Sequence, residues 1–118
     1  MQSYQLFITL PKTTDVEIGR LGLFTFPKGV YVYTGSARRN MDKRIRRHLS
    51  RDKNLHWHVD YLLADEENKI FKVTKSELEE CDLNSLTKGR VIVKGFGSSD
   101  CKKKCKSHLK LWKEITTS

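Results

Sequence analysis

The alternation of apolar and polar side chains predicts several short strands. Residues 4–10 are rich in aromatic and aliphatic side chains and end at Pro11, which cannot continue a central strand. Residues 29–33 show a similar pattern, and we expect Gly35 to end that strand. Residues 12–27 place glycine and proline among leucine and phenylalanine, which indicates a hairpin. Two further strands are expected at residues 70–74 and 91–93.

A helical spacing of apolar residues occurs in the middle of the chain. Met41, Ile45 and Leu49 recur at i, i+4 and i+8, so they predict the buried stripe of a helix over residues 41–51 with Asn40 as its N-cap. Further helices are expected at residues 57–63, 77–86 and 99–112. This order predicts one α+β domain, with a small, mostly antiparallel sheet of three or more strands flanked by helices.

The charge of the chain favours a polyanionic partner. The 118 residues carry a formal net charge of +9, so we expect nucleic acid to bind, DNA before RNA. Eight basic side chains are expected to contact phosphates: Arg38, Arg39, Lys43, Arg46, Arg47, Lys102, Lys103 and Lys106. A basic surface that only faces solvent is the alternative.

Hydropathy and cysteine content set further limits. No apolar run approaches the roughly 20 residues of a membrane span, so no membrane partner is expected. The three cysteines, an odd number, argue against a secreted disulfide framework. We therefore expect a cytoplasmic protein.

The strand and helix around residue 35 carry side chains suited to phosphate-ester chemistry. Tyr31 and Tyr33 share one face of a strand. Arg44 and His48 lie four residues apart beside the apolar stripe, so we expect them to be sheltered and to act on a phosphate. A neighbouring arginine can lower the pKa of a tyrosine, which would then orient or deprotonate a water. The other basic residues of this helix are expected to point into solvent: Lys43, Arg46 and Arg47. An ordinary solvated basic helix is the alternative.

This pattern resembles the GIY-YIG nuclease superfamily. The run Tyr33-Thr-Gly35 resembles its second tyrosine motif. Arg44 and His48 match an arginine and a histidine that follow this motif in the superfamily. Either Tyr4 or Tyr31 fills the first tyrosine position, and Tyr4 is preferred because the two motifs normally lie on separate strands.

A longer signature is similar to a smaller branch, known mainly as domain of unknown function 123. Its segments cover nearly the whole chain in order: YVYTGSA at 31–37, RIRRHL at 44–49, WHVDYL at 57–62, EC at 80–81, GFGSSDC at 95–101 and SHL at 107–109.

The resemblance implies a metal-dependent endonuclease that hydrolyses phosphodiester bonds. One Mg²⁺ or Mn²⁺ would be held by Glu80, with Glu77 and Glu79 as rival ligands. The tyrosines would orient or deprotonate the attacking water. Arg44 would stabilise the charge of the transition state and His48 would assist proton transfer.

The remaining histidines and the cysteines leave alternatives open. His58 is expected to line the site as a second catalytic or phosphate-binding histidine. A zinc site is less favoured, because the spacing lacks the usual short ligand loop and buried cysteine often packs as a small hydrophobe. Its ligands would be Cys81, Cys101, Cys105 and His108.

A non-catalytic nucleic-acid-binding module with the same fold is the second hypothesis for function. With no separate recognition domain in the sequence, we expect any sequence specificity to come from a partner protein.

Overall fold

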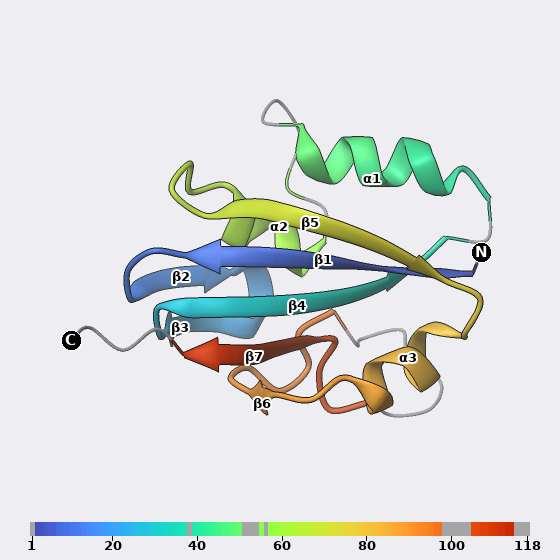
Figure 1. Ribbon diagram of the computed structural model, residues 1–118. Helices are drawn as coiled ribbons and strands as arrows, with labels where there is room; N and C mark the ends of the chain where they lie inside the picture. The colour runs from blue at the N-terminus through green and yellow to red at the C-terminus, as the bar shows by residue number, and fades with distance from the viewer. Residues whose placement is uncertain (1, 38, 51–54, 56, 98–104, 115–118) are drawn as a thin grey trace.

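The computed structural model describes residues 2–37, 39–50, 55, 57–97 and 105–114. In this part of the chain, an antiparallel five-stranded sheet has the order β5-β1-β4-β7-β6, and β2 and β3 form a separate pair (Figure 1). The elements in chain order are β1 Ser3–Leu10, β2 Thr14–Ile18, a 3-10 turn Gly19–Leu21, β3 Gly22–Phe26, β4 Gly29–Ser36, α1 Met41–Leu49, α2 His58–Leu63, β5 Lys69–Ser76, α3 Glu80–Leu86, β6 Arg90–Val91 and β7 Leu109–Glu114. The predicted α+β fold is confirmed. None of the described helices is long and apolar enough to cross a membrane.

One face of the sheet carries the hydrophobic core. Leu6, Ile8 and Leu10 alternate along β1 and are fully buried. In Figure 1, α2 and the β2–β3 hairpin lie behind the sheet and cover this face. Val59 and Leu62 of α2 belong to the same core cluster. This packing fixes the strand ends on which the candidate site is built.

The opposite face is turned toward the viewer in Figure 1, and α3 with Thr87 covers one end of it, where Nε2 of Gln5 donates to Oγ1 of Thr87 and Thr34 is fully buried. The ring of Phe7 on β1 lies 6.2 Å from the ring of Phe71 on β5 and 5.8 Å from that of Trp112 on β7. Phe71 is 55% exposed and Trp112 is 49% exposed. The Lys72 ammonium lies 5.2 Å from the centre of the Phe7 ring. These four residues are called the aromatic–lysine face below.

The last predicted helix is wrong. Residues 105–108 are not helical, and the chain then forms β7 beside β4. Leu109 and Leu111 are buried while Trp112 is half exposed, which is the two-residue period of a strand. The spacing of the cysteines and His108 suggested a helix, but pairing with β4 decides the conformation.

Two local predictions also need correction. Gly35 does not end β4, which continues to Ser36. Leu49 is 50% exposed, whereas His48 is 2% exposed and turns inward beside Ile45. Relative to Met41, a turn of about 100° per residue places His48 about 20° away and Leu49 about 80° away, so the buried side of the helix is on the Met41–His48 side.

The other predicted elements are present with shifted ends. The first strand and the hairpin are confirmed, as are the helix after Trp57 and the strand after Asn68. The helix expected from Glu77 begins at Glu80, and the expected 91–93 strand is reduced to Arg90–Val91.

A buried ion pair joins α2 to α1. The side chain of Asp60 is fully buried, and its Oδ2 accepts a hydrogen bond of 2.9 Å from the backbone N–H of Trp57, which caps α2. Nη1 of Arg47 lies 3.1 Å from the same oxygen. Arg47 was expected to point into solvent, but a buried carboxylate needs a charged partner, so the guanidinium turns inward.

Asp60→Ala is expected to lower the free energy of unfolding by about 3 kcal/mol, because the helix cap and the buried pair are lost together. Urea denaturation measures this loss. Asp42→Asn is the control, since Asp42 pairs with Lys75 at the exposed surface and should leave the midpoint nearly unchanged. Equal midpoints for the two variants would contradict the structural role of Asp60.

Candidate active site

The residues expected from the sequence meet at one end of the sheet. Tyr4 lies at the start of β1, opposite Gly35 near the end of β4. The Tyr4 hydroxyl is 2.7 Å from Nε2 of His48 on α1. Tyr4 is 1% exposed and His48 is 2% exposed, so water does not compete for this hydrogen bond.

Gly35 makes room for this hydrogen bond. A Cβ atom at this position would lie 2.5 Å from both Cζ and Oη of Tyr4. The other six glycines of the chain have positive φ angles, and Gly35 does not. Gly35 is therefore required for space rather than for an unusual backbone conformation, which gives the Tyr33-Thr-Gly35 motif a physical meaning.

His48 is enclosed by aromatic rings. Its ring centre lies 5.6, 6.0 and 5.4 Å from those of Tyr4, Tyr33 and Trp57. The Arg44 guanidinium lies 4.8 Å from the centre of the Trp57 ring, and its Nη1 donates to the backbone carbonyl of Ser36. The structure thus brings together four of the residues that the sequence singled out. They are called the Tyr4–His48 cluster below: Tyr4, Tyr33, Arg44 and His48.

Burial raises the pKa of Tyr4 and that of Tyr33 well above the ordinary value. Desolvation of the phenolate is the largest cause for each, and Arg44 offsets only part of it. Arg44 lowers each tyrosine pKa as expected, but burial outweighs it, so the expected net lowering is wrong. Both phenols are protonated at neutral pH, so Tyr4 meets His48 as a neutral hydroxyl group.

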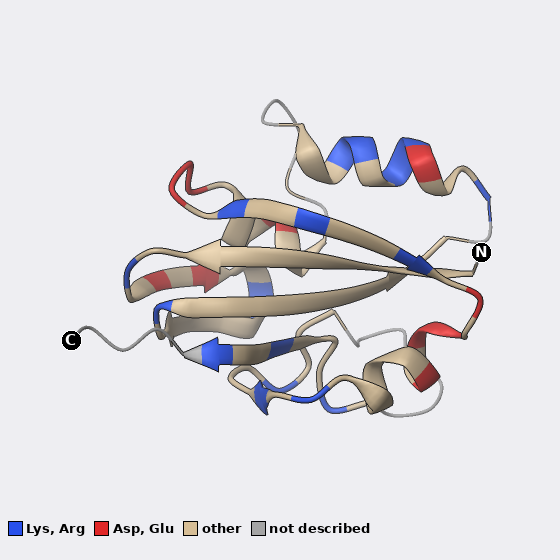
Figure 2. Ribbon diagram, viewed as in Figure 1, with Lys and Arg blue, Asp and Glu red and all other residues tan. Residues whose placement is uncertain are grey.

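An open basic groove lies beside the Tyr4–His48 cluster. Its volume is about 390 Å³, and it is lined by Arg39, Asn40, Lys43, Arg44 and Arg47. Figure 2 shows basic residues along α1. Arg44 lines the groove and also hydrogen-bonds Tyr4, so an anion in the groove lies next to the cluster. Arg46 is exposed on the same helix.

Glu80 is the first residue of α3. Its Oε1 lies 2.8 Å from Nδ1 of His108, and its side chain is 24% exposed. Its negative charge contributes to the raised pKa of Tyr4 and of Tyr33, so its field reaches both phenols. The rival carboxylates are exposed at Glu77 and Glu79.

A second group of polar side chains follows Glu80. Sγ of Cys81, Sγ of Cys105 and a ring nitrogen of His108 all lie within 4.8 Å of one another. The sequence placed the last two on a helix with Cys101, which lies outside the described residues. The structure instead brings Cys81, Cys105 and His108 together where α3 meets the segment before β7.

Tyr31 has its contact away from the cluster, whereas His58 lies next to it, because Phe96 packs against both His58 and Tyr33. The Tyr31 hydroxyl donates to the carbonyl oxygen of Pro27 at 2.5 Å, so Tyr4 rather than Tyr31 reaches His48. Nδ1 of His58 accepts a hydrogen bond of 2.8 Å from the backbone N–H of Gly97. Desolvation lowers the pKa of His58. These contacts give His58 a part in holding the loop at Gly97.

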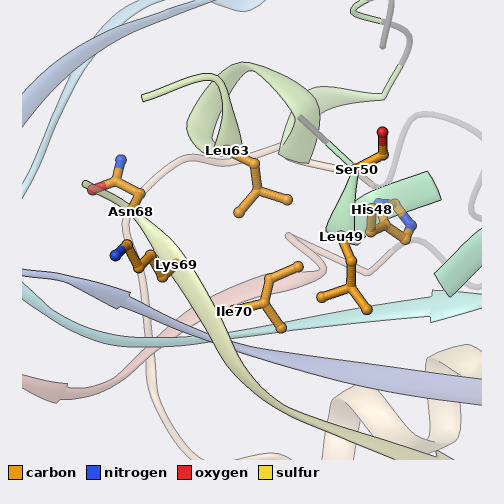
Figure 3. Close-up of a pocket in the computed structure, with 7 residues that line it drawn as sticks. All are labelled: His48, Leu49, Ser50, Leu63, Asn68, Lys69 and Ile70. Atoms are coloured by element: carbon orange, nitrogen blue, oxygen red, sulfur yellow. The ribbon is translucent and has the colours of Figure 1, made fainter. Parts of the chain in front are cut away.

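A separate pocket of about 150 Å³ has His48 among its lining residues (Figure 3). The aliphatic side chains of Leu49, Leu63 and Ile70 converge on it in this view. No arginine or acidic residue lines it. Lys69 supplies a positive charge there, but the basic groove offers several cations including Arg44, so the candidate site is assigned to the groove instead.

Sequence reasoning missed Trp57 as part of the site. This ring packs against His48 at an interplanar angle of 46°, and its centre lies 4.4 Å from the Arg47 guanidinium. Its place at the start of the WHVDYL segment was the available signal. Lys106 is exposed before β7, away from α1 in the chain. Three other expected contact residues lie outside the described part: Arg38, Lys102 and Lys103.

Gly35→Ala is expected to cost about 1–3 kcal/mol in unfolding free energy, because the added methyl group must displace the Tyr4 ring. Guanidinium denaturation measures this cost. The same substitution made in a Tyr4→Ala background should cost much less, since the obstructing ring is gone. An equal cost in both backgrounds would mean that Tyr4 is not the obstacle.

Comparison with known families gives one match. The sequence profile of the family described as Domain of unknown function DUF123 matches residues 3–118. No curated protein and no solved structure matches the chain. The match runs from β1 through the last described strand and so includes the Tyr4–His48 cluster, Glu80 and the cysteines. The chain therefore belongs to the DUF123 family, a domain of unknown function.

Proposed function

We propose that this protein is a metal-dependent endonuclease of the GIY-YIG type, which hydrolyses phosphodiester bonds in nucleic acid, DNA before RNA. The observation that carries the proposal is the buried 2.7 Å hydrogen bond between Tyr4 and His48, with Arg44 beside it. A phenol, an imidazole and a guanidinium in contact supply proton transfer and charge neutralisation, which are the two requirements of this reaction.

Tyr4 is proposed to carry a proton between water and His48. Burial keeps the Tyr4 pKa high, so the residue begins as a neutral phenol. Its O–H donates to Nε2 of His48, and its oxygen would accept a proton from an attacking water that enters with the substrate on the side of Arg44. As the proton from Tyr4 passes to His48, the water oxygen bonds to phosphorus and the bond to the leaving oxygen breaks. His48 ends the step as an imidazolium, and the leaving oxygen takes a proton from solvent.

The basic groove is the proposed seat of the scissile phosphate. Arg44 connects the groove to Tyr4, so its guanidinium would face both the phosphate and the attacked side of phosphorus. Arginine suits this task because its planar fork pairs with two phosphate oxygens at once. Arg39 and Lys43 are exposed at the same groove and would neutralise neighbouring phosphates.

Glu80 fits a divalent cation that keeps most of its water. Mg²⁺ is commonly held by one or two carboxylates, and the Glu80 carboxylate is partly exposed and its field reaches the tyrosines. When bound, Mg²⁺ or Mn²⁺ would offset negative charge on the phosphate and the leaving oxygen. The 2.8 Å contact with Nδ1 of His108 would orient the Glu80 carboxylate for this task.

A non-catalytic nucleic-acid-binding module is the second candidate function. The aromatic–lysine face favours it, because exposed rings beside a lysine suit the stacking of unpaired bases. Such a module would bind nucleic acid with a steep salt dependence and leave it intact. A screen of labelled duplex, branched and single-stranded substrates, with and without Mg²⁺ or Mn²⁺, separates the two candidates.

Arg44→Ala is expected to reduce single-turnover cleavage by about 100-fold or more, because one charge-stabilising donor near the reacting phosphate is lost. Arg46→Ala is the matched control. Arg46 is exposed on the same helix and outside the groove lining, so this variant should lose at most a few-fold in affinity. Similar rates for the two variants would remove Arg44 from the reaction.

Glu80→Gln keeps the size and polarity of the side chain but removes the charge that would hold a cation. Cleavage is expected to fall by orders of magnitude at every Mg²⁺ concentration, while affinity for nucleic acid is unchanged or slightly higher. Glu79→Gln, at the exposed neighbouring position, should remain near wild type. Full metal-dependent cleavage by Glu80→Gln would contradict the assignment.

A further inference from the structure

Two cysteines, Cys81 and Cys105, have no role in the proposed reaction. Cys81 lies in the first turn of α3, directly after Glu80, and Cys105 lies in the segment before β7. Neither forms a disulfide bond with another described residue. They converge with His108, whose side chain is almost fully buried, so that the three ligand atoms lie within 4.8 Å of one another. Two thiols and an imidazole at this spacing are the donors that zinc prefers.

The orientation of His108 supports a metal. Its Nδ1 faces Oε1 of Glu80 at 2.8 Å, and its Nε2 lies 4.0 Å from Sγ of Cys81. A histidine that donates from one ring nitrogen to a carboxylate presents a lone pair on the other nitrogen. Histidine ligands of zinc are commonly held by a carboxylate in this way. The present contact between Nδ1 and Glu80 is short but does not have the geometry of a hydrogen bond; a small rotation of the Glu80 carboxylate would form one and set the tautomer that a cation next to the thiols would need.

The distances also suit zinc. With Zn–S near 2.3 Å and Zn–N near 2.05 Å, a tetrahedral site has S···N separations of about 3.6 Å and S···S separations of about 3.8 Å. The 4.0 Å between Cys81 and His108 is a few tenths of an ångström longer. The remaining separations exceed the ideal by no more than about 1.2 Å, since all fall within 4.8 Å. Side-chain rotation alone can close such gaps.

We propose that Cys81, Cys105 and His108 bind one Zn²⁺, with Glu80 positioning His108. Binding would release the protons of the two thiols, so two thiolates balance the charge of the ion. The three ligands leave one tetrahedral position for water or another donor. The site ties the start of α3 to the segment before β7 and so fixes Glu80, one residue from a ligand. It does not depend on nuclease activity.

The test is the zinc content of the purified protein and its optical spectrum after replacement of zinc by Co²⁺. The full chain is stripped with a chelator under reducing conditions and reloaded with either metal. Wild type is expected to hold one zinc per chain, and the cobalt form to show thiolate charge transfer and the intense visible bands of tetrahedral cobalt. Cys105→Ser and His108→Gln should lose both signals. Asp82→Asn, an exposed acidic neighbour of Cys81, should keep them.

Two further measurements keep the result independent of folding defects and of catalysis. A chelator should lower the Tm of wild type, and added zinc should restore it. Glu80→Gln should weaken zinc binding by about 10–100-fold, as loss of a supporting carboxylate does. His48→Gln should keep full zinc content, because His48 belongs only to the Tyr4–His48 cluster. Reduced wild type that takes up no zinc, or Cys105→Ser that retains the full cobalt spectrum, would overturn the proposal.

Discussion

The hydrogen bond between Tyr4 and His48 is the contact on which the candidate site depends. It joins the first strand of the sheet to α1 across a gap that exists only because Gly35 has no side chain. Its burial keeps the Tyr4 pKa high and the phenol neutral. The same contact turns His48 toward the core, against the ring of Trp57, on which Arg44 also stacks. The buried Tyr4–His48 contact therefore accounts for the position of His48, the protonation of Tyr4 and the placement of the Arg44 charge beside them.

The first residues of α3 connect this cluster to the rest of the molecule. The field of Glu80 reaches the buried tyrosines, its carboxylate contacts His108, and Cys81 follows it directly. A zinc ion beside His108 would hold the carboxylate without taking part in the reaction. β7 pairs with β4, the strand that carries Tyr33. A displacement of the zinc ligands before β7 would therefore also displace the Tyr4–His48 cluster. The two metals proposed for this protein would thus have different tasks, one structural and one chemical.

The sequence predicted the fold class and most of the candidate site, because local signals carried both. The alternation of apolar and polar residues predicted β1, and the spacing of Arg44 and His48 predicted which side of α1 faces the candidate site. The last helix was wrong because its spacing fits a helix, whereas pairing with β4 is a long-range interaction that spacing does not record. The tyrosine pKa was wrong in direction because burial depends on the packed fold. The approach of Cys81 to Cys105 was likewise hidden by the distance between them in sequence.

The most direct test of this account is single-turnover cleavage by wild type and by Tyr4→Phe with the best substrate found, across a series of Mg²⁺ or Mn²⁺ concentrations. Tyr4→Phe keeps the ring over Gly35 and removes only the hydroxyl that reaches His48. The account predicts metal-dependent cleavage by wild type, a fall of about 100-fold or more in the variant, and equal affinity for nucleic acid. Undiminished cleavage by Tyr4→Phe would contradict the role of the Tyr4–His48 pair. Binding without cleavage by wild type, over the whole substrate panel, would contradict the nuclease and leave the binding module.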